Sequence, residues 1–161
     1  MWRYGGHCGE AMNRLMICAG SVRREGWQTL DCKPGHDFVA MIPPLPDAVK
    51  AIQWDEIEWV HGITSFYPWD GEAILRECHS VLNVGGKIVL ELPDASKCNP
   101  AEHPEWLFGD PSLKESEHMN RWAYTPFSIR GLLEKVGFTR IEMLPAQHHL
   151  PTRDFRAEAY R

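Results

Sequence analysis

Small and acidic residues follow the first two apolar runs of the chain, in the order that a nucleotide-binding site requires. Cys18, Ala19 and Gly20 end the first run, and Asp31 and Cys32 end the second. Small residues after a strand let a ligand approach the backbone, and an acid after the next strand can accept hydrogen bonds from ribose hydroxyls. An acid that ends a strand also serves as a turn residue, so this pattern alone leaves both interpretations open.

Two further strand exits carry candidate site residues. Met41 and Ile42 end a third apolar run, and His61 and Gly62 end a fourth. Ligands of open parallel sheets bind outside the carboxyl ends of the strands, so these exits belong to one expected site. His61 is the candidate catalytic base, because an unperturbed imidazole titrates near neutral pH. A histidine hydrogen-bonded at a strand end is an equally good interpretation of this residue.

Alternating strands and helices must position these side chains. This alternation favours an α/β fold, a Rossmann-like doubly wound sheet of about seven strands, mostly parallel with an antiparallel closing strand. Only six residues, "SVRREG", separate Gly20 from Trp27, so the first crossover helix must be missing or reduced to a turn. The expected strands lie at 14–19, 27–31, 37–42, 55–62, 87–92, 139–146 and 154–161.

Two helices are expected between these strands. Apolar residues on one face predict a helix at 69–83, with Asp70 as its N-cap. A second helix begins after Thr125 as N-cap, with Pro126 at its first position, and ends at Gly137.

The segment 94–123 is longer than a simple connecting loop in a compact domain, and it is predicted to form a lid or substrate loop with some helix. Residues 1–161 are read as a single domain, with 1–12 as a loose lead-in. Arg153 and Asp154 are expected to pair at the surface, and His148-His149 face either the site or solvent. The side chains expected to line an acceptor beside this segment are Tyr67, Trp69, His118, Trp122 and Tyr124; each could also serve only in packing.

Composition narrows the function classes. The chain has 161 residues, a formal net charge of −5 and no Lys/Arg cluster, which argues against a dedicated nucleic-acid partner. Its apolar stretches are shorter than the roughly 18 residues that a membrane span needs, and no membrane partner is expected. Five cysteines without a CxxC pair argue against a disulfide framework and favour a reducing, cytoplasmic setting. His7-Cys8 lack a second clustered pair, so no metal site is expected.

Four stretches together resemble one family. "ECHSVLNVGGKIVLELPD" and "TPFSIRGLLEKVGFTRIEM" resemble the fifth strand and the following helix of class I S-adenosylmethionine-dependent methyltransferases. "REGWQTLDCKPGHDFVAMIPPLP" and "DEIEWVHGI" are similar to the second to fourth strands of small, trimmed members of that family. The resemblance covers roughly residues 15–161 and implies a seven-stranded sheet with S-adenosyl-L-methionine at the carboxyl ends of its first strands.

The resemblance also assigns roles residue by residue. Cys18, Ala19 and Gly20 occupy the glycine-motif loop beside the methionine part of the cofactor, and Asp31 occupies the ribose-binding position, followed by Cys32. The positions that flank the adenine correspond to Met41 and Ile42. His61 to Ile63, including Gly62, would lie beneath the sulfonium. The implied acceptor is a small molecule or a sugar-like compound.

Three departures from the family pattern keep a second hypothesis open. Cys18 replaces the first glycine of the motif, Met41 replaces a common acid, and Thr64-Ser65 replace a Glu-His pair. These changes suit a non-catalytic binding or structural module with a degenerate cofactor site. A nucleotide-dependent oxidoreductase is the third reading, ranked lower because no G-x-G-x-x-G opens a helix. Many tryptophans and a shortened N-terminal half also fit a homodimer.

Overall fold

The computed structural model describes residues 12–161, so the lead-in predicted at 1–12, except Met12, and the His7-Cys8 pair lie outside the described residues. The strands are β1 (Arg14–Ile17), β2 (Gln28–Asp31), β3 (Phe38–Val39), β4 (Trp54–Val60), β5 (Leu82–Pro93), β6 (Thr139–Pro145) and β7 (Asp154–Tyr160). The α-helices are α1 (Asp47–Lys50), α2 (Pro68–Val81), α3 (Glu105–Phe108) and α4 (Pro126–Val136). Short 3-10 helices span Ile63–Ser65, Ala95–Lys97, Pro111–Leu113 and Ser116–His118. No helix within 12–161 has the length and apolarity needed to cross a membrane.

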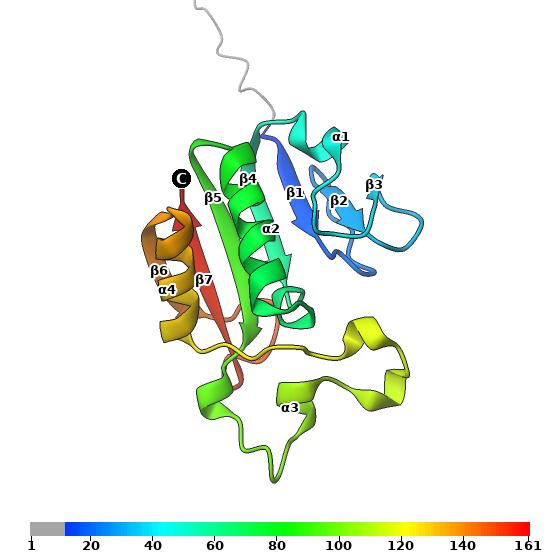
Figure 1. Ribbon diagram of the computed structural model, residues 1–161, viewed down its shortest axis with the longest axis vertical. Helices are drawn as coiled ribbons and strands as arrows, with labels where there is room; N and C mark the ends of the chain where they lie inside the picture. Colours follow the sequence, from blue (N-terminus) through cyan, green and yellow to red (C-terminus); the bar gives the residue numbers. More distant parts are fainter. Residues whose placement is uncertain (1–11) are drawn as a thin grey trace, which may run out of the picture.

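All seven strands form one sheet in the order β3-β2-β1-β4-β5-β7-β6. Strand β7 is antiparallel to both of its neighbours, and the other pairs are parallel, which confirms the predicted mixed sheet. The carboxyl ends of β1, β2, β4 and β5 therefore share one edge, at the lower end of the sheet in Figure 1. Because β7 runs the other way, its first residue, Asp154, lies opposite Pro93 at this same edge.

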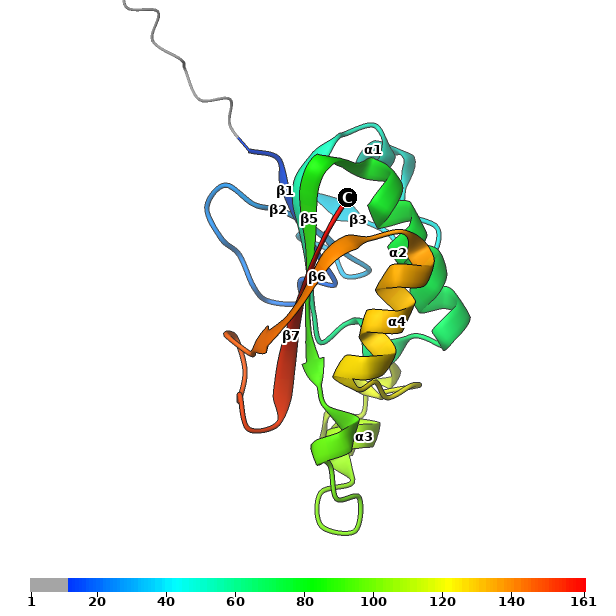
Figure 2. The same ribbon diagram turned by 90° about the vertical axis from the view of Figure 1, so that its left-hand side faces the viewer.

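The predicted loss of the first crossover helix is confirmed. Tight turns connect β1 to β2, closed by hydrogen bonds from Val22 N–H to the Ala19 carbonyl (3.0 Å) and from Trp27 N–H to the Arg24 carbonyl (3.1 Å). Figure 2 shows α1, α2 and α4 on one face of the sheet, while the β1–β2 and β6–β7 loops lie on the other.

Side chains along the strands alternate between an apolar face, which the helices cover, and a charged face, which they do not. Leu15, Ile57 and Leu90 belong to the apolar core on the helical face. On the opposite face, Lys87 Nζ lies 3.2 Å from Glu56 Oε1 and 3.3 Å from Glu158 Oε2, each on a neighbouring strand. A ladder of paired charges tolerates water, so this face needs no covering helix.

Helix ends follow local signals only in part. The structure confirms Thr125 as the N-cap of α4, with a capping box to Ser128, and Gly137 as its C-cap. The prediction of Asp70 as the N-cap of α2 is wrong. Helix α2 begins at Pro68, because the fixed φ of proline suits the first helical position, and Asp70 then falls in the first turn.

Two predicted strands have different limits in the structure. The run at 37–42 pairs only over Phe38–Val39, since this edge strand soon meets Pro43 and Pro44. Strand β5 is longer than expected: the predicted helix at 69–83 stops at Val81, and Leu82 already pairs with Trp54.

Residues 94–123, here called the strap, contain short helical turns as predicted and run along the carboxyl edge (Figure 1). Lys33 Nζ, just after β2, lies 2.8 Å from Glu115 Oε2 of the strap. The Arg121 N–H donates to the Thr64 carbonyl at 2.7 Å, and its guanidinium donates to the Ser65 carbonyl at 2.6 Å. The strap thus connects the exits of β5, β4 and β2.

Candidate functional site

The loop after β1 has a left-handed backbone at two residues, only one of which is glycine. Cys18 and Gly20 both have positive φ, 53° and 55°. A Cβ atom at Gly20 would meet no other atom within 4 Å, so there is open space beside this glycine. A left-handed conformation is costly for a residue with a side chain, so Cys18 keeps a backbone geometry that its side chain disfavours.

Asp31, at the end of β2, is tied to this loop. Its Oδ2 accepts the N–H of Gly20 at 2.9 Å and its Oδ1 accepts the N–H of Lys33 at 3.1 Å. Partial burial opposes ionisation of the carboxyl group, but these N–H groups outweigh it and lower the pKa of Asp31. Each carboxylate oxygen has a second lone pair, so Asp31 can still accept hydrogen bonds from a ligand.

The exit of β4 packs tightly against the exit of β1. A Cβ atom on Gly62 would overlap the indole of Trp59 and would lie 3.0 Å from the Cβ of Cys18. Burial raises the pKa of the Cys18 thiol to about 12. Cys18 is therefore a neutral packing group between the two exits.

The remaining residues predicted beside the cofactor differ in exposure. Ala19 is buried, and Ile42 packs against the apolar core. Cys32 is exposed and the Met41 side chain is 78% exposed. Met41 thus offers an apolar surface to solvent next to the exit of β3.

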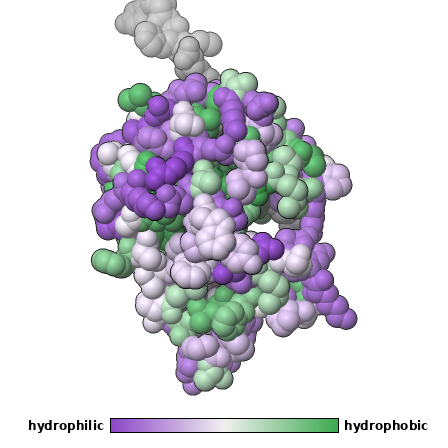
Figure 3. Space-filling model, in the orientation of Figure 1, coloured by the Kyte–Doolittle hydropathy of each residue, from purple (hydrophilic) through white to green (hydrophobic). Residues whose placement is uncertain are grey.

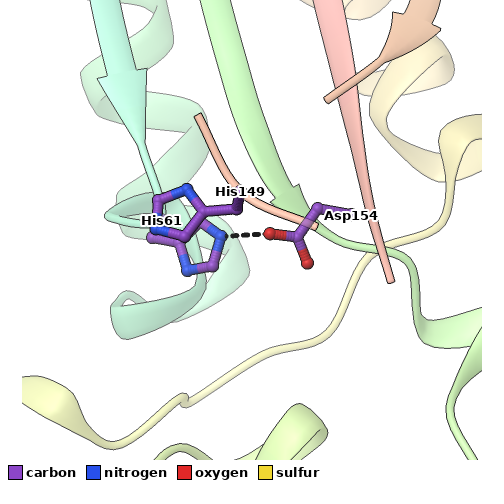
Figure 4. A group of neighbouring side chains, drawn as sticks. All are labelled: His61, His149 and Asp154. Atoms are coloured by element: carbon purple, nitrogen blue, oxygen red, sulfur yellow. Dashed lines mark hydrogen bonds and ion pairs between the residues drawn. The ribbon is translucent and has the colours of Figure 1, made fainter. Parts of the chain in front are cut away.

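His61 and Asp154 form a hydrogen-bonded pair at the carboxyl edge, drawn in Figure 4. His61 Nε2 lies 2.6 Å from Asp154 Oδ2. The Asp154 side chain has no exposed surface, whereas that of His61 is 30% exposed. Asp154 also accepts from the Arg153 guanidinium, Nε to Oδ1 at 2.5 Å and Nη2 to Oδ2 at 2.8 Å.

These contacts correct the prediction of a surface pair between Arg153 and Asp154. The pair exists, but β7 pairing brings Asp154 to the sheet edge and buries it. Burial opposes ionisation, yet hydrogen bonds from His61 and Arg153 lower the pKa of Asp154 to about 2.

A second histidine reaches the same place from the β6–β7 loop. The ring of His149 stacks on that of His61, with centroids 3.8 Å apart and 20° between the planes. The buried carboxylate of Glu91 accepts the backbone N–H groups of Gln147, His148 and His149 at 2.8–2.9 Å. Glu91 therefore fixes the β6–β7 loop. An acid inside the largely apolar strand β5 is the sequence feature that could have indicated this contact.

No protein-family model and no curated protein matches the sequence. Solved structures do match the fold. A SAM-dependent methyltransferase from Archaeoglobus fulgidus has a TM-score of 0.61 at 14% identity, covering 94% of this chain and 87% of the other. One from Thermotoga maritima has a TM-score of 0.62 at 14% identity, with coverages of 92% and 82%. The chain has the fold of a class I methyltransferase.

An O-methyltransferase family protein from Burkholderia thailandensis has a TM-score of 0.65 at 13% identity. It matches 94% of this chain, but this chain spans only about half, 51%, of that protein. Identities at this level establish the methyltransferase fold and do not establish the reaction.

The residues predicted on the acceptor side occupy separate places in this methyltransferase fold. Tyr67 and Trp69 are exposed and stack on each other, with ring centroids 4.8 Å apart. Tyr124 is buried in the core, where burial raises its pKa to about 12. His118 lies in the strap, with its Nε2 3.0 Å from Glu115 Oε2.

The strap contains a concave region of about 280 Å³ with a mainly apolar lining. Trp122 and Phe108 are half-exposed there, at 50% and 56%. Figure 3 shows hydrophobic residues gathering toward this lower end of the molecule. Its lining residues are Leu107, Phe108, Asn120, Arg121, Trp122 and Ala123.

Proposed function

We propose that this protein binds S-adenosyl-L-methionine at the carboxyl edge of its sheet and transfers a methyl group to a small-molecule or sugar-like acceptor. The observation that carries the proposal is the Asp31–Gly20 hydrogen bond. It sets an ionised acid beside a left-handed loop with open space at its glycine, within a sheet of methyltransferase topology.

The residues present fit this cofactor. Asp31 has lone pairs for the two ribose hydroxyls, and the open space beside Gly20 leaves room for the methionine part. Met41 and Ile42 supply apolar surface for an adenine ring. The bound cofactor supplies an electrophilic methyl group on a sulfonium, so the chain must mainly position the acceptor and exclude water.

His61 is the proposed base for an acceptor that must lose a proton. When Asp154 accepts the hydrogen bond from Nε2–H, the lone pair of the imidazole resides on Nδ1. Asp154 engages only Nε2, so Nδ1 is the nitrogen that can take a proton from an acceptor. Asp154 and Arg153 are positioning residues, since they fix the tautomer and the ring.

Calorimetry with S-adenosylhomocysteine tests the cofactor site. Asp31→Ala is expected to weaken binding by about tenfold or more, because hydrogen bonds to a charged acceptor contribute about 1.5–3 kcal/mol. Glu25→Ala is the matched control, an exposed acid in the neighbouring β1–β2 loop that is expected to leave affinity unchanged. Absence of binding at millimolar ligand, or equal effects of the two variants, would contradict the proposal.

The left-handed backbone of Cys18 favours a second candidate function, a non-catalytic module that keeps the fold. Such a module would bind the cofactor weakly or not at all and would have no turnover. Methyl transfer to any acceptor that is lost in Asp31→Ala would exclude it.

A further inference from the structure

His61 follows β4, whereas His149 and Asp154 lie close together in sequence, in the β6–β7 loop and at the start of β7; the three residues meet at the carboxyl edge (Figure 4). One ligand atom of each residue lies within 4.8 Å of those of the other two. Two imidazole nitrogens and a carboxylate oxygen are the donors that zinc and related divalent ions prefer. Magnesium and calcium prefer sites made only of oxygen atoms.

The surroundings of the cluster match those of a metal site. Asp154 is fully buried and is held by Arg153, which orients the carboxylate. Glu91 Oε1 lies 3.6 Å from His149 Nδ1, so a carboxylate faces the ring nitrogen on one side and leaves Nε2 as the donor. Metal-binding histidines commonly present their second nitrogen to such a carboxylate.

We propose that His61, His149 and Asp154 bind one divalent transition-metal ion of the zinc class. On binding, His61 Nε2 gives up its proton to solvent and Nδ1 takes one up; Nε2 and Asp154 Oδ2, 2.6 Å apart without the ion, must move apart because each lies about 2 Å from a bound zinc. The stacked rings of the two histidines are nearly parallel, so the His149 ring must turn about its side-chain bonds to reach the ion. Its 40% exposed side chain leaves room for this rotation.

Occupancy of this site has a consequence that rests on the proposed function. A neutral imidazole that binds an ion through Nε2 carries its proton on Nδ1. Nδ1 of His61 is then a donor and cannot take a proton from the acceptor. The bound ion is therefore expected to inhibit transfer to acceptors that need a base.

Zinc titration of the folded full chain by calorimetry tests the site, with two adjacent histidines as a matched pair. His149→Ala is expected to weaken zinc binding by more than about tenfold. His148→Ala is the control: His148 Nε2 bonds to Glu58 Oε1 at 2.7 Å, outside the cluster, and its loss should leave affinity within about twofold. Circular dichroism establishes that each variant is folded.

Cobalt(II) absorption identifies the donors. A spectrum of nitrogen and oxygen ligation that disappears in His149→Ala supports the site, whereas a sulfur-to-cobalt charge-transfer band would place the ion on a cysteine and overturn it. No zinc binding by the folded protein at about 100 μM, or equal losses in His148→Ala and His149→Ala, would also overturn it. Zinc binding without S-adenosylhomocysteine binding contradicts only the proposed function.

Discussion

At the scale of single residues, the ends of β1 and β4 at the candidate site contain residues with unusual backbone or packing properties. Cys18 has a left-handed backbone, and Gly62 is the residue whose missing side chain lets the β4 exit pack on Trp59. Asp154 is ionised although it is buried, because His61 and Arg153 donate to it. The packing of Cys18 and of Gly62 can each be tested by a separate measurement.

The thiols of Cys18 and Cys32 should differ in reactivity. Burial raises the pKa of Cys18 to about 12, so almost none of it is thiolate at neutral pH, and Cys32 is exposed. Peptide mapping after iodoacetamide treatment of the folded protein should show Cys32 alkylated well before Cys18. Equal labelling of both under native conditions would contradict the packing at the β1 exit.

Gly62→Ala should destabilise the protein by about 1–3 kcal/mol, because the new methyl group overlaps the buried indole of Trp59. Gly131→Ala in α4 is the control. A Cβ atom there meets nothing within 4 Å, and alanine should stabilise the helix by about 0.5–1 kcal/mol. Urea unfolding measures both changes, and a neutral Gly62→Ala would show that the two exits pack more loosely.

At the scale of elements, paired charges replace a helix on one face of the sheet. Glu158 lies beside Arg156 and Lys87 on that face. Partial burial opposes its ionisation, but these cations outweigh burial and lower the pKa of Glu158. A lowered pKa stabilises the fold above the ordinary pKa of the carboxyl group, and this contribution disappears as pH falls through the lowered value.

Glu158→Gln should therefore lower the free energy of unfolding by about 1 kcal/mol at neutral pH, and by less at acid pH where Glu158 is protonated. Glu134→Gln on the exposed side of α4 is the control and should have little effect at either pH. Denaturant titrations at the two pH values measure the difference. A loss that is independent of pH would mean that the charge of Glu158 is not what stabilises this face.

Elements set by local sequence were predictable, and those set by distant pairing were not. Thr125 and Gly137 cap α4 through neighbouring residues, and the short β1–β2 connection left no room for a helix. The burial of Asp154 depends on the register of β7 against β5, which its own neighbours do not encode. The position of His149 depends on Glu91, more than fifty residues earlier in the chain.

At the scale of the whole molecule, the seven strands form one sheet, with helices α1, α2 and α4 on one face (Figure 2). The carboxyl edge carries the loop after β1, Asp31 and His61, and the strap lies along it. The proposed cofactor site lies at this edge.

A crystal structure of the protein with S-adenosylhomocysteine tests the central proposal most directly. We predict density along the carboxyl edge, with the ribose hydroxyls within hydrogen-bonding distance of Asp31 and the amino-acid part against Cys18–Gly20. Ligand density elsewhere, or a carboxyl edge that stays empty at saturating ligand, would contradict it.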